Sequence, residues 1–95
     1  MTEGPLPLWY RVHALQRMVE RDIREEDVRR VVHEGKEIAS YPGDKPYPSR
    51  LLLGWIGEQP IHVVAATAEH EIIVITVYEP DPDQWAPGFE RRKRT

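Results

Sequence analysis

Apolar residues recur at helical spacing in the first third of the chain. Between Val12 and about Arg21, the apolar positions fall on one side of a helix: Val12, Leu15, Met18 and Val19. The polar positions fall on the other side: His13, Arg17, Glu20 and Arg21. This separation predicts an amphipathic helix that begins near Val12.

A second helix is predicted after an interruption at residues 22–24. Residues 25–27 are all acidic, which suits the positive N-terminal end of a helix. Three valines then follow at i, i+3 and i+4, and Gly35 is a typical helix stop. The pattern therefore predicts two short helices joined by a tight turn.

From Lys36 onward the pattern changes to that of strands. Four β-rich stretches are separated by turn residues: Glu37–Tyr41, Arg50–Ile56, Ile61–Thr67 and Ile72–Tyr78. The proline-rich residues 42–48 fit neither a helix nor a central strand. Short connections between the last three strands favour antiparallel pairing.

Side-chain alternation along these strands predicts two different faces. We expect the helices to cover a face that is apolar throughout: Leu51, Leu53, Trp55, Ile73, Ile75 and Val77. His62 and Tyr78 belong to the opposite face, which mixes polar and apolar residues and is expected to be partly exposed. Trp85 and Phe89 are expected to dock the end of the chain on the body. A functional site is therefore expected on the second face.

Together these elements predict an α+β fold. Two N-terminal helices pack on one face of a small, mainly antiparallel sheet of about four strands. Residues 1–11 carry prolines and a glycine and are expected to form a loose arm. Residues 12–90 form a single domain, because a chain of 95 residues can bury only one modest core. Residues 91–95 form a basic tail.

Composition narrows the class of protein. The absence of cysteine excludes disulfides and thiol catalysis. No stretch approaches the roughly 20 apolar residues of a membrane helix, and no signal peptide is visible, so a cytoplasmic location without membrane contact is expected. Four of the 13 Lys and Arg residues lie at positions 91–94, and the other nine face 16 Asp and Glu residues. The basic end is either a solubilising tail or a phosphate-binding one.

His13 and Arg17 are one helical turn apart, with Arg21 one turn further. An imidazole can move a proton near neutral pH, and guanidinium groups can stabilise the extra negative charge of a phosphorane. This combination suits phosphodiester cleavage, although the spacing alone favours a solvated helix face near Glu20 and Asp22. The histidines lack the spacing of a helical zinc site, so neither a metal nor a cofactor is expected.

Two further candidates lie on the strands. His62 stands alone in an apolar strand, where a histidine usually has a structural role, and it is functional only if the second face holds the site. Tyr78 ends the last strand just before Glu79 and Pro80. A tyrosine at a strand end is either catalytic or part of ordinary packing.

Several blocks of the chain carry a family resemblance. The first is His13-Ala14-Leu15-Gln16-Arg17-Met18-Val19-Glu20-Arg21-Asp22-Ile23, followed by a helix from Val28 to Gly35 and by Tyr41-Pro42. The others are Ile61-His62-Val63-Val64 and Ile73-Val74-Ile75-Thr76-Val77-Tyr78-Glu79-Pro80-Asp81, with Trp85 after it. In these blocks the chain resembles a family of small bacterial proteins known as domain-of-unknown-function family 4258. The likeness extends over about residues 12–92.

The resemblance implies a distant relationship to RelE-like and MqsR-like ribonuclease toxins, with a RelE-like or barnase-like fold. Such toxins cleave messenger RNA without metal. The implied catalytic residues are His13, Arg17, His62 and Tyr78. The implied RNA-binding residues are Arg21, Arg50, Arg91 and Arg92. The implied partners are RNA or the ribosome and a cognate antitoxin protein.

One departure keeps two hypotheses open. RelE-like toxins tend to be basic, whereas this chain has a pI near 5.8, which weakens affinity for phosphates. The first hypothesis is a toxin-type, metal-independent endoribonuclease. The second is a non-enzymatic module that binds a protein through its acidic body, its tail and aromatics such as Tyr47 and Trp85.

Overall fold

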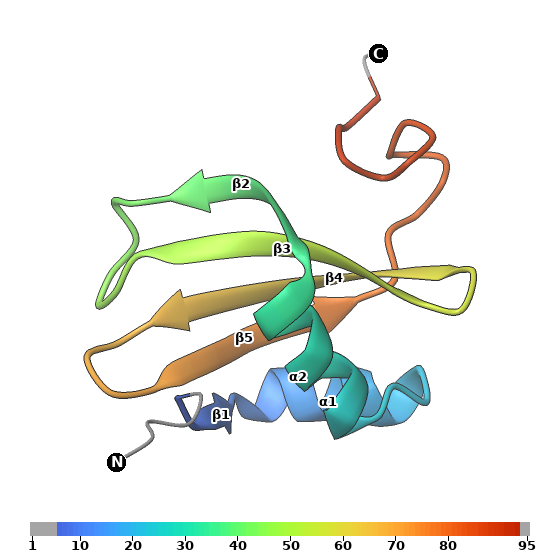
Figure 1. Ribbon diagram of the computed structural model, residues 1–95. Helices are drawn as coiled ribbons and strands as arrows, with labels where there is room; N and C mark the ends of the chain where they lie inside the picture. The colour runs from blue at the N-terminus through green and yellow to red at the C-terminus, as the bar shows by residue number, and fades with distance from the viewer. Residues whose placement is uncertain (1–5, 94–95) are drawn as a thin grey trace.

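The chain folds around a five-stranded sheet with two helices. The computed structural model describes residues 6–93. Its elements, in chain order, are β1 (Leu8–Tyr10), α1 (Val12–Glu20), α2 (Glu25–Glu34), β2 (Lys36–Tyr41), β3 (Ser49–Ile56), β4 (Gln59–Thr67) and β5 (Ile72–Tyr78). In Figure 1, α1 lies at the bottom beside β1, and α2 lies in front of the lower strands. The predicted α+β class is confirmed, and each predicted helix and strand is present.

The sheet has one more strand than predicted, and it is mixed. Its strand order is β1-β5-β4-β3-β2, in which β2 to β5 form an antiparallel meander. β1 adds to β5 in parallel, with Leu8 opposite Ile72. This strand lies within the residues 1–11 that suggested a loose arm. Three residues are too few to show a periodic pattern, so the sequence could not reveal it.

The helix-covered face holds the core, but its residues differ from those predicted. The buried cluster contains Leu52 from β3, together with Ile72, Val74 and Val77 from β5. Leu51 and Leu53 are also buried, but they lie outside this cluster. Three consecutive leucines fit either face equally well. On β5, a register shift opposite Val64 and Ala65 changes the alternation.

Helix α2 packs directly on β3 through a glycine. A Cβ atom on Gly54 would lie only 2.2 Å from Cγ2 of Val31, so a larger residue would force α2 away from the sheet. At the start of α2, the Arg24 backbone N–H donates to Asp27 Oδ2 at 3.2 Å, which caps the helix. The helix ends, as predicted, at Gly35.

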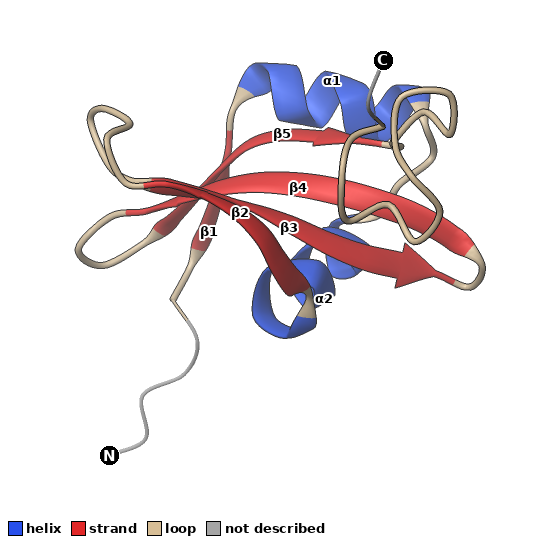
Figure 2. Ribbon diagram, turned by 90° about the horizontal axis from the view of Figure 1, so that it is seen from above, coloured by secondary structure: helices blue, strands red, loops and turns tan. Residues whose placement is uncertain are grey.

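Helix α1 exposes most of the side that the sequence suggested as its buried one. Ala14 and Met18 face the core. In contrast, Val12, Leu15 and Val19 are 69%, 45% and 82% exposed. The helix lies alongside β5, so a narrow strip of its surface is enough to complete the core (Figure 2). Helical periodicity identified the helix but not the direction in which it faces.

The C-terminal segment, residues 79–93, covers the other face of the sheet. In Figure 1 this segment lies above the strands, and in Figure 2 it passes over the sheet. Trp85 is only 8% exposed, and the Phe89 ring packs against Trp55 with centroids 6.0 Å apart. The predicted docking of Trp85 and Phe89 is confirmed. None of the helices within residues 6–93 is long and apolar enough to cross a membrane.

Candidate functional site

His62 lies at the centre of the sheet face opposite the helices. Its neighbours along β4, Ile61 and Val63, belong to the helix-covered core, so the His62 side chain must point the other way. The C-terminal segment covers it completely, and its exposed fraction is 0%. The predicted second face therefore exists, but in this conformation it is covered.

Both ring nitrogens of His62 are hydrogen-bonded. Nε2 lies 2.9 Å from the Phe89 carbonyl oxygen, which can only accept, so Nε2 carries the proton. In the neutral ring, Nδ1 then accepts from the Tyr78 hydroxyl, 3.0 Å away. His62 thereby ties together β4, the end of β5 and the C-terminal segment.

A small loop within the C-terminal segment delivers the Phe89 carbonyl to His62. Trp85 and Arg92 form an antiparallel bridge that closes this loop. Between them, Gly88 and Phe89 have φ angles of 89° and 61°, both in the left-handed region. A non-glycine residue such as Phe89 adopts this conformation at a cost, which the surrounding contacts must offset.

The His62 cluster comprises His62, Tyr78, Trp85 and Arg92. The Trp85 ring packs edge-on against the imidazole, with centroids 4.5 Å apart and an interplanar angle of 88°. Cζ of Arg92 lies 5.2 Å from the centroid of Trp85, within cation–π range. The cluster therefore combines an imidazole and a phenol of the sheet with an indole and a guanidinium of the C-terminal segment.

The environment shifts the two titratable groups in opposite directions. Burial lowers the pKa of His62 below its usual value, and the positive charge of Arg92 acts in the same sense. Burial raises the pKa of Tyr78, although Arg92 opposes this effect. At neutral pH the imidazole is therefore held neutral, able to accept a proton, and the phenol is held protonated, able to donate one.

The structure brings three of the predicted site residues together and leaves others apart. His62, Tyr78 and Arg92 share the cluster. His13 and Arg17 lie on the exposed surface of α1, where Arg17 pairs with Glu20 at 3.5 Å. No hydrogen bond or ion pair within residues 6–93 joins His13 or Arg17 to the cluster.

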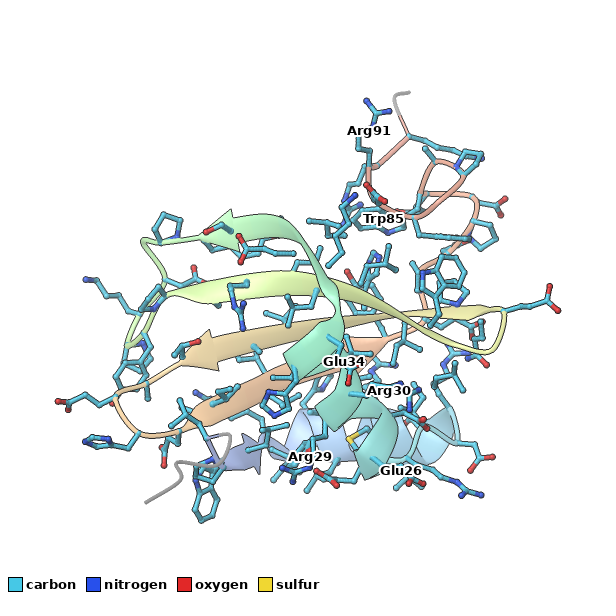
Figure 3. All side chains as sticks on the ribbon, in the orientation of Figure 1. Glu26, Arg29, Arg30, Glu34, Trp85 and Arg91 are labelled. Carbon is cyan, nitrogen blue, oxygen red and sulfur yellow. The ribbon has the colours of Figure 1, made fainter. Side chains whose placement is uncertain are left out.

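The remaining predicted RNA-binding residues lie in three different places. Arg21 pairs with Glu79 at 4.0 Å, at the start of the C-terminal segment. Arg50 pairs with Glu37 at 3.6 Å and lies opposite Ala65, a core residue, so it is on the helix side of the sheet. Arg91 is exposed at the outer end of the C-terminal segment (Figure 3).

Sequence reasoning missed two partners of His62. The Phe89 partner is a backbone carbonyl, which no side-chain pattern identifies. Trp85 was expected to dock on the body, but nothing in the sequence indicated that it packs on the imidazole. Within residues 6–93, no group of three or more His, Asp or Glu side chains is placed to hold a metal ion.

A separate groove lies where α2 ends beside β3; we call it the Trp55 groove. Strand β2 pairs with β3 as far as Leu53, which leaves the rest of the β3 edge open at this point. The groove has a volume of about 320 Å³. Its charged and aromatic lining consists of Arg30, Glu34, Lys36, Trp55 and Glu90.

Comparison with known proteins places the chain in one family. No curated protein and no solved structure matches it. The family described as a domain of unknown function, DUF4258, matches residues 10–79. The match includes His62 and Tyr78 and stops at the start of the C-terminal segment that covers them. The chain therefore belongs to the DUF4258 family.

Proposed function

We propose that this protein is a metal-independent endoribonuclease of the toxin type, with a RelE-like or barnase-like arrangement of helices and sheet. One observation carries the proposal: His62, Tyr78 and Arg92 lie together on the sheet face opposite the helices. They supply a proton acceptor, a proton donor and a fixed positive charge. These are the groups that RNA cleavage without metal requires.

The proposed reaction is an internal phosphoryl transfer. The 2′-oxygen of a ribose attacks the adjacent phosphorus, and the bond from phosphorus to the 5′-oxygen breaks. The products are a 2′,3′-cyclic phosphate and a free 5′-hydroxyl. Neutral His62 takes the proton of the 2′-hydroxyl, and Tyr78 donates a proton to the leaving 5′-oxygen. Arg92 stabilises the extra negative charge of the phosphorane.

RNA can reach this site only after the loop between Trp85 and Arg92 lifts away from His62, which is fully buried, while the Trp85–Arg92 bridge keeps Arg92 beside the site. The contacts that would have to break are the hydrogen bond from His62 to the Phe89 carbonyl, the packing of Phe89 on Trp55, and one exposed ion pair. Lys36 and Glu90 form an ion pair of 2.9 Å, but their side chains are 65% and 46% exposed. Surface pairs of this kind contribute at most about 1 kcal/mol. Opening of the segment is therefore part of the proposal.

Cleavage of a labelled single-stranded RNA in the presence of EDTA tests the proposal. We expect products that end in a 2′,3′-cyclic phosphate and no cleavage of the matching 2′-deoxy oligonucleotide. Tyr78→Phe removes one hydroxyl and should lower the rate by roughly 10²-fold or more, since acid–base catalysis contributes on that scale. Tyr47→Phe, in the exposed loop before β3, is the matched control.

A second experiment tests whether His13 and Arg17 on α1 contribute to the function. The double variant His13→Ala, Arg17→Ala should abolish growth arrest on induced expression if α1 contributes to RNA binding or chemistry. Both side chains are exposed, so the fold should persist, and circular dichroism checks this. A fully toxic double variant would restrict the site to the His62 cluster. RNA cleavage that survives Tyr78→Phe unchanged would refute the mechanism.

The full burial of His62, with both nitrogens engaged, favours a second candidate. On this view the cluster is structural and the protein is a non-enzymatic module that binds a partner. Glu90→Gln should loosen the C-terminal segment. If neither the wild type nor this variant cleaves RNA or arrests growth while folded, the binding module becomes the conclusion.

A further inference from the structure

The Trp55 groove has the charge and shape of a site for a cationic side chain. We propose that it binds the guanidinium of an arginine presented by a partner protein. This inference is independent of the proposed ribonuclease activity, because Trp55 and Glu34 take no part in the reaction described above. It is carried by the ion pairs, the exposed indole and the apolar floor of the groove.

The cations of the groove are already neutralised. Arg30 Nη2 lies 3.1 Å from Asp27 Oδ1, and Lys36 Nζ lies 2.9 Å from Glu90 Oε1. Glu34 forms no ion pair with any residue in the range 6–93. The carboxylate of Glu34 is therefore the charge left over. A phosphate would have to displace two existing ion pairs, whereas a cation meets a free acceptor.

The free carboxylate comes from the same wall of the groove as Arg30. Arg30 and Glu34 are four residues apart on α2, and this spacing places both on one side of the helix (Figure 3). The Arg30 guanidinium also lies 3.5 Å from the Trp55 carbonyl oxygen, which links the helix to β3. Arg30 and Glu34 line the groove from α2, and Trp55 lines it from the open edge of β3.

Trp55 supplies a face on which a flat cation can stack. It is 43% exposed and lies near the end of β3, next to the turn into β4. The Phe89 ring meets it edge-on at an interplanar angle of 72°, which supports the indole from one side. A guanidinium over an indole face is attracted by the ring quadrupole, and its fork of N–H donors matches a carboxylate.

The floor of the groove suits the apolar part of an arginine side chain. It is formed by Val31, Leu53 and Gly54, which are apolar and buried. The methylene stem of an arginine covers such a surface while its charged head reaches the carboxylate. The acidic body of the chain favours the same kind of ligand, because it attracts basic partners over longer distances.

A peptide titration followed by ¹H–¹⁵N NMR of the full chain tests this proposal. The probe is acetyl-Gly-Arg-Gly-amide, and the matched control peptide replaces arginine by citrulline, which has the same shape without the charge. We expect the arginine peptide to shift the Trp55 indole N–H and the amides of residues 30–36. The citrulline peptide and adenosine monophosphate should leave these signals in place.

Two variants complete the test. Glu34→Gln should weaken binding of the arginine peptide roughly fivefold or more, since a charge-assisted contact is lost. Glu26→Gln removes a carboxylate from the other end of α2, where it pairs with Arg24, and should change nothing. Equal shifts from the citrulline peptide, stronger shifts from the nucleotide, or unaltered binding by Glu34→Gln would each overturn the proposal. RNA cleavage by the wild type is unaffected by any of these outcomes.

Discussion

The two faces of the sheet are covered in different ways. On one face, two regular helices bury an apolar cluster in which Ile61, Val63 and Val77 are fully inaccessible. On the other face, one irregular segment covers His62, and its contacts include the hydrogen bond from His62 to the Phe89 carbonyl, an exposed ion pair and the rings of Trp85 and Phe89. The same strand, β4, contributes to both faces through alternate residues.

The helices and the C-terminal segment differ in how easily each can separate from the sheet. Removal of the helices would expose the main apolar core, so the helix-covered face can open only with global unfolding. Removal of the C-terminal segment would break a few polar contacts, expose Trp85 and His62, and end the packing of Phe89 on Trp55. The segment-covered face therefore has the lower opening free energy, and it is also the face with titratable groups.

The largest expected effect comes from a substitution in the helix-covered core. Ile61→Ala should lower the free energy of unfolding by about 2–5 kcal/mol, because it leaves a cavity in a closely packed cluster. Urea denaturation measures the loss. For a domain whose total stability is on the order of 5–15 kcal/mol, such a loss is severe.

Trp85→Ala is the companion variant on the opposite face. It should mainly accelerate hydrogen exchange and proteolysis of residues 79–93, with a smaller shift of the urea midpoint than Ile61→Ala. A midpoint shift as large as that of Ile61→Ala would show that the segment is an integral part of the global fold, and the contrast between the faces would be lost.

A pH effect of intermediate size should come from His62. Its pKa is lowered in the folded protein by burial, so the unfolded chain binds a proton first as the pH falls below about 6.5. Stability is therefore expected to decline as the pH falls below about 6.5, with the contribution of neutral His62 lost as the pH falls through its folded-state pKa. Thermal melting as a function of pH measures this dependence.

His62→Leu should flatten this pH dependence, and it should also destabilise the protein by about 1–3 kcal/mol because the Phe89 carbonyl and the Tyr78 hydroxyl lose their partner. His33→Gln, at an exposed position on α2, is the control and should retain the wild-type slope. An unchanged slope in His62→Leu would mean that other groups control the acid sensitivity.

The smallest effect on stability is expected from Glu90→Gln. This variant removes an exposed ion pair with Lys36 and should cost less than about 1 kcal/mol in global stability. Its effect on the C-terminal segment should be easier to detect, as faster amide exchange in residues 84–93. Under the proposed function it should also increase the rate of RNA cleavage. Glu69→Gln, in the turn before β5, serves as the control.

Much of the architecture could be predicted because it depends on local patterns. The valines of α2 at i, i+3 and i+4, and the β-branched residues of β5, indicate their elements without any knowledge of neighbours. Strand alternation predicted His62 and Tyr78 on the same face, and this is confirmed, although the same alternation placed Val74 there and the register shift on β5 puts it in the core. Their direct hydrogen bond depends on the β4–β5 register, which pairs the two residues.

The predicted buried faces of β3 and α1 were wrong because the local pattern was compatible with two arrangements. The three leucines of β3 can turn either face to the helices, and close packing at Gly54 decides between them. The apolar residues of α1 were expected to be buried, but Ala14, which has a small side chain and little periodic signal, occupies the fully buried position. Position relative to β5, not amphipathicity, selected that side.

By itself, then, the sequence determined the order of the two helices and of the four antiparallel strands, since periodicity is carried by residues close together in the chain. It also predicted that an imidazole and a phenol share one face. Only the tertiary structure decided what covers that face, because the Phe89 carbonyl reaches His62 from 27 residues away. The Trp55 groove is likewise lined by residues of α2, β3 and the C-terminal segment, and no local sequence pattern indicates that these parts of the chain are adjacent.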